Sequence, residues 1–583
     1  MSAQNIFLVH NLVSDLPNLA DHQDPNLINP WGNGFGQSPF WIGNNGSGTA
    51  TLYDGYGTAS ALVVNIPAPG GATTGGAVSG VIDNIFSSNT AAFTLAAGKP
   101  ASFLFCSEDG LIMGWNSSVD STHAHVLFDN SASGAVYKGC ALGGTAAAPV
   151  LFAANFNAGT VDVFNGSLGV ISTSKTFANP AIPAGFAPFN VQLINGNVYV
   201  LYAKQDDMKH DDVAGVGNGY LAVFDQSGTL LTNLVSQGLL NSPWGMAIAP
   251  ATFGPFGGDL LVSNFGDGRI DAYNLTTGAL AGTLNLPNGN PVAIPGMWSI
   301  NFGSGAKNED PGTLYFAAGI GGGPNNDPVE SHGLFGSIQA TPSFTAGTVE
   351  SAASFISGPI AANEWVTITG NGLAATTGTW TVTGTQLPTT VNSVSVTVNG
   401  EAAPVSFVGN TQINLLIPAD IQAGTTPKIV VTNNGLASAP VTVTAQPMAP
   451  AFFIIGTNAT TGAHYIAATH ANGTLIGPAS ITGATPAEPG ETIVLYGAGF
   501  GATSSTIPNG QVITSALTLP VQPLISIDGL AATVQFAGLT GTGLYQFNVV
   551  VPAGVQRGAD DLAVALIGDT QTQPGAYLTI AAQ

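Results

Sequence analysis

The densest group of chemically reactive side chains lies between Lys204 and Asp212, where seven of nine residues are Lys, Asp or His. Charged residues make up only 7% of the whole chain. Carboxylate oxygens together with an imidazole suit Ca²⁺ or a catalytic divalent metal ion. The spacing matches neither an EF-hand loop nor an HExxH helix. The metal ligands predicted here are Asp206, Asp207, His210, Asp211 and Asp212, joined by Glu330 and His332 from a distant segment.

Three interpretations of this charged segment remain open. In the first, Lys204 and Lys209 pair with the aspartates in a self-neutralising network. The second is a structural calcium site, and the third is a catalytic metal site. Four aspartates within seven residues repel one another, and an extended loop in water would relieve this repulsion. The segment nevertheless lies between two predicted strands that tie it down on both sides, so we expect it to be held at one end of the fold.

Other catalytic patterns are missing from the sequence. It has no GxSxG motif and no Cys with a plausible His partner. Gly319–Gly323 precedes no predicted helix and carries no Lys, which argues against a phosphate-binding loop. No catalytic residue is therefore assigned. Glu108 and Asp206 could pair for glycoside hydrolysis if their carboxylates lay at a suitable separation.

The charged segment interrupts one of six similar units in the first 340 residues. Each unit has a β-rich run, a turn of Asn, Asp or Gly, and a second β-rich run. The units are Phe40–Asp54, Phe103–Asn116, Leu151–Asn165, Val198–Asp225, Leu260–Asn274 and Leu314–Ile338. A two-stranded hairpin cannot bury both of its faces alone, so such units must stack. Their spacing predicts a six-bladed β-propeller.

Two further sets of residues recur at matching points of these units. The turns carry Asn44, Asn45, Glu108, Asp109, Asn155, Asn264 and Asp267, which would ring a channel mouth if they shared one face. The alternative is ordinary turn chemistry. Trp31, Trp244 and Trp298 stand in short motifs expected on innermost strands, where packing between blades is the first interpretation and ligand stacking the second. The predicted ligand-binding residues are Trp31, Glu108, Asp109, Asn155, Lys204, Trp244, Asn264 and Trp298. The segment Asp21–Asp24 is interpreted as a cap or turn, with a metal-binding contribution as the alternative.

The residue composition of the sequence changes near Thr341. TPSFTAGT, residues 341–348, is interpreted as a linker, and alternating Val, Thr and Ala follow it. This second part is duplicated: Val394–Ile421 matches Leu524–Val555, and Glu364–Leu373 matches Glu491–Phe500. Short alternating strands with Gly and Pro turns predict immunoglobulin-like β-sandwiches at 349–447 and 448–583. The predicted fold is thus all-β, a propeller over residues 1–340 followed by two sandwiches.

The charge and the cysteine content limit the possible functions of the protein. Nine Lys and Arg against 32 Asp and Glu give a net charge of −23, which would repel nucleic acid. No apolar run is long enough to span a membrane. Cys106 and Cys140 lack metal-site spacing, so we expect two buried thiols, with a disulfide as the alternative. The first residues do not form a signal peptide. The sparse charge nevertheless favours a secreted or cell-surface protein, with its leader missing from this sequence.

Residues of about 5–340 resemble an uncharacterised family of secreted bacterial six-bladed propellers. The motifs that carry the resemblance are DPNLINPWG (Asp24–Gly32), SEDGLIMGWN (Ser107–Asn116), FNAGTVDVFN (Phe156–Asn165), AKQDDMKHDDVAGVGNG (Ala203–Gly219), NSPWG (Asn241–Gly245) and SHGLFGSI (Ser331–Ile338). Residues of about 345–583 resemble the tandem C-terminal module of acidobacterial surface proteins, through Ser351–Leu373, Thr411–Ile421 and Leu544–Val555. The resemblance implies export and fold, and implies no reaction.

These observations lead us to expect an exported, non-enzymatic protein. Its propeller would bind a glycan, a matrix component or another copy of the chain, and its sandwiches would act as a stalk or assembly module. One alternative is a metal-dependent hydrolase or lyase with its site in the propeller channel. Another is a fibre-forming subunit that associates through sandwich edges. The expected cofactor is Ca²⁺ or another divalent metal, or none.

Overall fold

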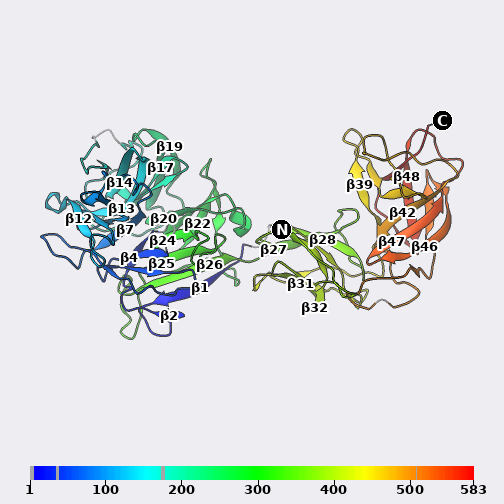
Figure 1. Cartoon of the computed structure of the whole chain (residues 1–583), viewed down its shortest axis with the longest axis horizontal. Helices are drawn as coiled ribbons and strands as arrows, with labels where there is room; N and C mark the ends of the chain where they lie inside the picture. The colour runs from blue at the N-terminus through cyan, green and yellow to red at the C-terminus, as the bar shows by residue number, and fades with distance from the viewer. Residues whose placement is uncertain (1–4, 35–38, 173–176, 507, 583) are drawn as a thin grey trace. The chain divides into compact units, whose positions relative to one another are not determined.

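The computed structural model describes residues 5–34, 39–172, 177–506 and 508–582. The chain divides into two compact units, Asn5–Ala340 and a second that begins at Thr341. Apart from two short 3-10 helices, η1 (Ser131–Ser133) and η2 (Gly254–Phe256), the regular elements of these described residues are strands. The predicted all-β class is confirmed (Figure 1). No helix among the described residues is long and apolar enough to cross a membrane.

The first unit is a six-bladed β-propeller, as predicted. Apart from one short parallel pairing in blade 6, each blade is an antiparallel sheet whose first strand in the following lists is innermost. Blade 1 contains β3 (Pro30–Gly34), β4 (Phe40–Asn44), β5 (Thr49–Tyr53) and β6 (Val64–Asn65). Blade 2 contains β7 (Val78–Asp83), β10 (Phe103–Ser107), β11 (Leu111–Trp115) and β12 (His125–Asp129), beside a hairpin of β8 (Thr94–Ala96) and β9 (Lys99–Pro100). Blade 3 contains β13 (Tyr137–Thr145), β14 (Ala148–Asn155) and β15 (Thr160–Asn165).

The remaining blades follow the same order. Blade 4 contains β16 (Phe186–Ile194), β17 (Asn197–Lys204), β18 (Gly219–Phe224) and β19 (Leu230–Ser236). Blade 5 contains β20 (Pro243–Ile248), β21 (Leu260–Asn264), β22 (Ile270–Tyr273) and β23 (Leu280–Thr283). Blade 6 contains β24 (Met297–Phe302), β25 (Leu314–Ala318), β26 (Leu334–Ala340), β1 (Phe7–Ser14) and the short β2 (His22–Gln23).

The propeller ring is closed by strands from the two ends of the unit. Strand β1 pairs antiparallel with β26, from Phe7 opposite Ala340 to Ser14 opposite Leu334, so blade 6 combines both ends (Figure 1). The innermost strands contact one another in sequence order, and β24 of blade 6 returns to contact β3 of blade 1. Apolar cores fill the spaces between blades; for example, Trp41 of blade 1 stacks on Phe103 of blade 2 at 4.1 Å between ring centroids.

Cys106 and Cys140 form a disulfide that joins β10 of blade 2 to β13 of blade 3. The first expectation of two buried thiols is therefore wrong. The two Cα atoms are 6.5 Å apart, within the span of a disulfide. Gly80 makes room for the bond, because a Cβ atom there would lie 2.5 Å from the Cys106 sulfur and 2.7 Å from the Cys140 sulfur. The sequence could not show that the propeller places neighbouring blades' cysteines together.

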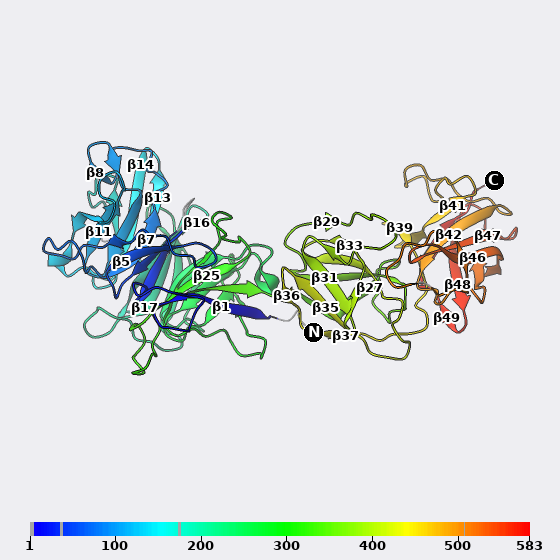
Figure 2. The same cartoon turned by 60° about the horizontal axis from the view of Figure 1, so that its bottom comes forward.

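The second unit contains two immunoglobulin-like sandwiches, as predicted (Figure 2). One sheet of the first sandwich contains β27 (Ser343–Ser351), β28 (Trp365–Asn371), β34 (Gln412–Leu416), β33 (Val405–Val408) and β29 (Gly378–Thr379). The facing sheet contains β30 (Thr390–Val391), β31 (Val394–Val398), β32 (Glu401–Ala403), β35 (Lys428–Asn433), β36 (Leu436–Ala437) and β37 (Val441–Thr442). Their inward residues form one apolar core.

The second sandwich repeats this plan. One sheet contains β38 (Ala451–Phe452), β41 (Ala468–His470), β42 (Thr492–Ala498), β47 (Leu544–Val550), β46 (Thr533–Gly541) and β43 (Leu517–Thr518). The other contains β39 (Ile454–Thr457), β40 (His464–Ile466), β50 (Ala576–Thr579), β48 (Asp560–Ile567), β44 (Leu524–Ile527), β45 (Leu530–Ala531) and β49 (Thr570–Gln571). Its core is separate from that of the first sandwich.

The interpretation of residues 341–348 as a linker needs correction. Most of this segment belongs to β27, which pairs with β28 and buries Phe344 and Val349 in the first sandwich. Small polar residues made the segment resemble a linker, but Phe344 within it and Val349 directly after it hold the strand in the sheet. Its register with β28 shifts between these two residues, which breaks the alternation in the sequence.

Candidate functional site

The candidate site is built on a bulge that recurs in every blade. The pairing of each innermost strand with its neighbour shifts register near the start of the innermost strand. Such a bulge redirects a side chain that would otherwise follow the sheet alternation. The residues at the six shifts are Trp31, Ser79, Lys138, Phe189, Trp244 and Trp298. We call these six residues the bulge layer.

The aromatic members of the bulge layer pack against one another. Trp31 stacks on Trp298 with ring centroids 3.6 Å apart, and Trp244 meets each of them edge-on at 6.3 and 6.0 Å. Phe189 lies 5.9 Å from Trp298. The three tryptophans are between 1% and 5% exposed. They therefore pack between blades, and this burial gives no support to the expectation that they stack on a ligand.

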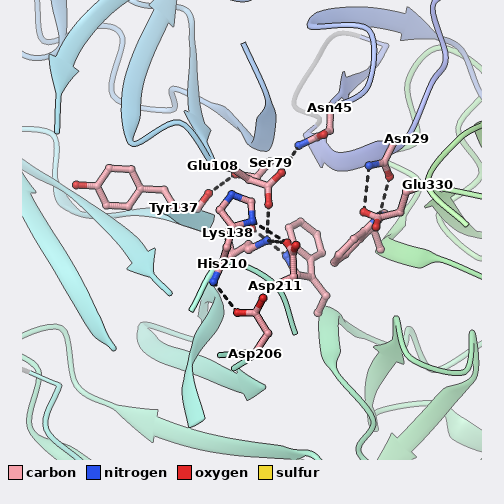
Figure 3. Close-up of polar contacts among 12 residues, drawn as sticks. Asn29, Asn45, Ser79, Glu108, Tyr137, Lys138, Asp206, His210, Asp211 and Glu330 are labelled. Atoms are coloured by element: carbon pink, nitrogen blue, oxygen red, sulfur yellow. Dashed lines mark hydrogen bonds and ion pairs between the residues drawn. The ribbon is translucent and has the colours of Figure 1, made fainter. Parts of the chain in front are cut away.

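Lys138 is the one cationic member of the bulge layer. Its side chain is 1% exposed, and Nζ lies 5.0 Å from the centre of the Trp31 ring. Nζ donates to a Glu108 carboxylate oxygen and to Asp211 Oδ1, the latter at 3.1 Å (Figure 3). Burial alone would lower the pKa of Lys138, but the negative charges of Glu108 and Asp211 outweigh it and raise the pKa above its usual value. Lys138 is thus a charged ammonium at neutral pH.

The two carboxylates reach Lys138 from different blades. Glu108 follows β10, and its other oxygen accepts a hydrogen bond from Asn45 Nδ2 of blade 1 at 2.7 Å. Asp211 lies in the loop between β17 and β18 of blade 4. That loop folds back on itself: the Asp206 amide donates to the Asp211 carbonyl at 2.8 Å, and the His210 amide donates to Asp206 Oδ1 at 2.9 Å. The charged segment is therefore held at the bulge layer.

Three of the predicted metal ligands meet here, and the others do not. Asp206, His210 and Asp211 lie together, with His210 Nδ1 2.9 Å from Asp211 Oδ1 (Figure 3). Asp207 is exposed. Asp212 is not among the side chains whose donor atoms group together; burial raises the pKa of its carboxyl, and the positive charge of Lys138 opposes this shift. The predicted pairing of aspartates with Lys204 and Lys209 is wrong, because neither lysine forms an ion pair within the part of the chain that the structure describes; Lys138 takes that role.

His332 and Glu330 differ in their relation to the cluster. His332 lies in a separate network, with Nδ1 2.6 Å from Asp15 Oδ2 and Nε2 3.2 Å from Asp327 Oδ2. Glu330 accepts a hydrogen bond from Asn29 Nδ2 at 3.1 Å at the edge of the cluster (Figure 3). Desolvation of its carboxyl, together with the negative charge of Glu108, raises the pKa of Glu330 to about 7.

The remaining predicted residues perform structural tasks in turns. Asp109 Oδ2 accepts a hydrogen bond from the Ala77 amide at 2.7 Å. Asn155 donates to Asp162 Oδ2, and Asn264 donates to Asp271 Oδ2, each at 2.9 Å. In the Asp21–Asp24 segment, Asp24 accepts from the Tyr53 hydroxyl at 2.8 Å. Contacts between neighbouring strands and segments thus satisfy these side chains without a ligand.

Glu108, His210 and Asp211 offer donor atoms that lie within 4.8 Å of one another, a group that could hold a divalent cation. The group fits Ca²⁺ poorly, because Ca²⁺ takes six to eight oxygen ligands. Moreover, one oxygen of each carboxylate already accepts from the Lys138 ammonium. The ammonium therefore supplies the positive charge that a metal would otherwise bring.

A cavity of about 530 Å³ opens beside this cluster. We call it the mouth pocket. Its titratable lining residues are Glu108, Asp109, Asp206, His210 and Asp211. Met208, which is 78% exposed, adds an apolar side chain to the lining. Because Lys138 is buried beneath the carboxylates, the pocket presents mainly negative charge.

Lys138 belongs to the candidate site, although the sequence patterns described above did not indicate it. It stands alone in the sequence, far from the charged segment. A signal for it exists nevertheless, because each bulge residue precedes a small or amide residue: Trp31-Gly32, Ser79-Gly80, Lys138-Gly139, Phe189-Asn190, Trp244-Gly245 and Trp298-Ser299. Aligning the innermost strands on these pairs places Lys138 with the tryptophans.

Parts of the chain are similar to a known domain family and to solved structures. Residues 353–445 match the family model of the IPT/TIG domain. Among solved structures, a glucose dehydrogenase covers 57% of this chain with all of its own length, at 13% identity and a TM-score of 0.36. The calcium-binding protein regucalcin from Agrobacterium tumefaciens covers 58% of this chain with 95% of its own, at 13% identity and a TM-score of 0.33. Likenesses this distant indicate no activity.

Two relatives by sequence are uncharacterised proteins of Acanthamoeba polyphaga mimivirus. One is 33% identical over 299 residues, which are 50% of this chain and 72% of the viral protein. The other is 31% identical over 299 residues, which are 50% of this chain and 77% of that protein. At this identity and coverage, the chain belongs to the same family as these two uncharacterised mimivirus proteins.

Proposed function

We propose that this chain is an exported, non-enzymatic binding protein whose mouth pocket receives a positively charged group of its ligand. The observation that carries the proposal is the lining of the mouth pocket, where Asp206 and Asp211 join Glu108 and Asp109. The nearest cation, Lys138, is buried and already bonded to two carboxylates, so it leaves the pocket negative. The two sandwiches would act as a stalk or assembly module.

The ligand class follows from the charge and the opening of the pocket. A protonated amine can donate charge-assisted hydrogen bonds to the carboxylates of Asp206 or Asp211, and the thioether of Met208 can cover an adjacent apolar carbon. Amino groups of this kind occur on glycans, on basic segments of matrix proteins, and on lysines of another copy of the chain. An anionic ligand would meet repulsion at the same place.

Binding of glucosamine oligomers tests this proposal, with fully N-acetylated oligomers of the same length as the uncharged control. We expect calorimetry to detect the amine form only, with affinity that falls as salt rises. Asp206→Asn should weaken binding, whereas Asp207→Asn should not, because Asp207 is exposed and does not line the pocket. Oligolysine compared with acetylated oligolysine separates a peptide ligand from a glycan. Equal binding of amine and acetylated forms would refute the proposal.

One observation favours a second candidate, a metal-dependent hydrolase or lyase. The pKa of Glu330, raised to about 7, lies near the value that suits a general acid or base at neutral pH. Glu108, His210 and Asp211 would have to hold the metal ion. This candidate predicts that hydrolysis of a glycan substrate requires an added divalent cation and disappears in Glu330→Gln. A protein that binds amines but hydrolyses nothing with any added cation excludes it.

A further inference from the structure

The first sandwich contains a pocket beside a break in its strand pairing. Between Phe344 and Val349, the chain of β27 stands opposite the single residue Thr369 of β28, so it bulges away from the sheet. The Thr348 hydroxyl closes the bulge, because it accepts from the Thr345 amide at 3.2 Å and donates to the Thr345 carbonyl at 3.1 Å. A cavity of about 420 Å³ lies between this bulge and the outer face of the sheet. We call it the sandwich pocket.

Five side chains that line the sandwich pocket offer polar atoms that are both unpaired and accessible. They are Thr345, Thr369, Asn371, Thr411 and Gln412, each half-buried or exposed. Within the part of the chain that the structure describes, no hydrogen bond involves the three threonine hydroxyls, the Asn371 amide or Gln412 Oε1, and none of these atoms is shut off from solvent. Gln412 Nε2 donates to Asn414 Oδ1 at 2.9 Å, which fixes the orientation of the Gln412 amide.

The chemistry of the lining restricts the ligand. The remaining lining residues are Ser343, Phe344, Thr348 and Gly370, so the pocket contains no Lys, Arg, His, Asp or Glu. A charged ligand would lose hydration here without meeting an opposite charge. Phe344, the one apolar side chain of the lining, is 4% exposed and offers no open ring face for stacking. The pocket must therefore select its ligand by uncharged hydrogen bonds.

The hydroxyl groups of a neutral sugar match this lining. A threonine hydroxyl both donates and accepts, and a carboxamide places a donor beside an acceptor. Two adjacent sugar hydroxyls suit the carboxamide, because one can accept while the other donates. The volume of the pocket lies within the usual range for ligand sites, about 300–1,000 Å³. Ala346 and Gly347 of the bulge are exposed, as is Thr411, so the rest of a longer glycan can extend into solvent.

The second sandwich shows that the fold itself does not require these polar groups. Strands β28 and β42 occupy the same place in the two sandwiches. Where β28 has Thr369 and Asn371, β42 has Tyr496 and Ala498. A bulky ring and a methyl group thus serve the same sheet, so the free hydroxyl and amide of the first sandwich are left for a task other than folding.

We propose that the sandwich pocket binds a neutral sugar unit of a glycan, with Thr369, Asn371 and Gln412 as its principal hydrogen-bonding residues. The site lies in the first sandwich and is uncharged, whereas the mouth pocket lies in the propeller and is acidic. The proposal therefore goes beyond the proposed function and does not depend on it. It gives the first sandwich a binding task besides that of a stalk.

Calorimetry of the full chain with cellohexaose, maltohexaose and mannohexaose tests the proposal. We expect at least one of them to bind, with an affinity that does not change with salt, because no charged residue lines the pocket. The double variant Thr369→Tyr with Asn371→Ala gives the first sandwich the residues that the second has, so it should fold. It should bind about tenfold more weakly or less, because it loses two hydrogen-bonding groups and the tyrosine ring takes up space in the pocket.

Asn371→Ala alone removes a single amide, so it keeps the test valid if the double variant fails to fold. Thr397→Ala, on β31 of the facing sheet, is the matched control and should leave the affinity unchanged. The glucosamine titrations remain separable, because the double variant removes this site without changing the mouth pocket. Failure of all three oligosaccharides to bind would overturn the proposal. Binding that is equally strong in the native chain and in the variants of Thr369 and Asn371 would also overturn it.

Discussion

Replacing Lys138 by Met removes the only cation of the bulge layer and keeps most of the side-chain volume. At an effective dielectric constant of about 20, two unit charges 3.1 Å apart attract by about 5 kcal/mol. Asp211 is 66% exposed, so water screens its share to about 1 kcal/mol or less. Glu108 is 10% exposed and would remain as an uncompensated charge. Removing one partner of a buried ion pair costs about 3–5 kcal/mol, and we expect a loss in this range.

Calorimetry of the full chain can measure this loss in the melting transition of the propeller. Unfolding a unit of about 340 residues changes the entropy by roughly 0.7 kcal/mol per kelvin, so Tm should fall by about 4–7 °C. Lys209→Met is the matched control, because Lys209 is exposed and belongs to the same network only through its backbone. Its Tm should change by less than about 1 °C.

A double-mutant cycle separates the ion pair from the packing of the lysine chain. Glu108→Gln keeps a hydrogen-bond acceptor for Lys138, and the double variant Lys138→Met with Glu108→Gln removes both buried charges. If the uncompensated carboxylate causes the loss, the double variant should be more stable than Lys138→Met alone. A double variant whose loss equals the sum of the single losses would refute the electrostatic reasoning and leave packing as the cause.

Three further predictions concern other parts of the chain. Cys106→Ser should destabilise the propeller by roughly 3–4 kcal/mol, the entropy expected for a closed loop of 34 residues, and reductant should lower the Tm of the native chain but not of the variant. Burial raises the pKa of Glu364 to about 8. The stability that this group contributes should therefore be complete below about pH 4.5 and be lost as pH rises through 8. The variant Glu364→Gln should melt with a flatter pH profile. A hydrogen bond from the ring to Asp15 raises the pKa of His332. The contact between Asp15 and the segment before β26 should therefore be strongest below pH 6.5 and weaken as pH rises above it. An Asp15→Asn variant that keeps the native pH dependence would contradict this.

The repeated units of the sequence were enough to predict the propeller and its number of blades. Each unit contains the second and third strands of a blade, and the turn between them is marked by Asn, Asp or Gly, as in Phe40–Asp54 for β4 and β5. Such hairpins are local, so their turn residues appear in order along the sequence. The closing contact of β1 with β26 joins opposite ends of the unit and left no local pattern.

Contacts between blades were harder to predict for the same reason. The disulfide joins an inner strand of one blade to the second strand of the neighbouring blade, and nothing near Cys106 indicates Cys140 as its partner. The charged segment was correctly expected to be held by the fold. Its compensating cation was sought nearby, at Lys204 and Lys209, whereas Lys138 of another blade provides it. Charge neutralisation depends on distance in space, so neighbours in sequence had no advantage.

The bulge layer explains how a lysine at one of its positions, Lys138, can both create the charged site and be separated from the rest of the propeller axis. Four of its six positions are aromatic and pack as a dry layer across the axis. A cation at the fifth, Lys138, cannot reach water through that layer, so it must find carboxylates on its own side, and Glu108 and Asp211 meet it there. The small residues that follow the bulge residues leave a cavity of about 270 Å³ on the other side. The same repeat thus separates two cavities, and exchanging Lys138 for an aromatic residue should leave the carboxylates of the mouth pocket without their buried cation.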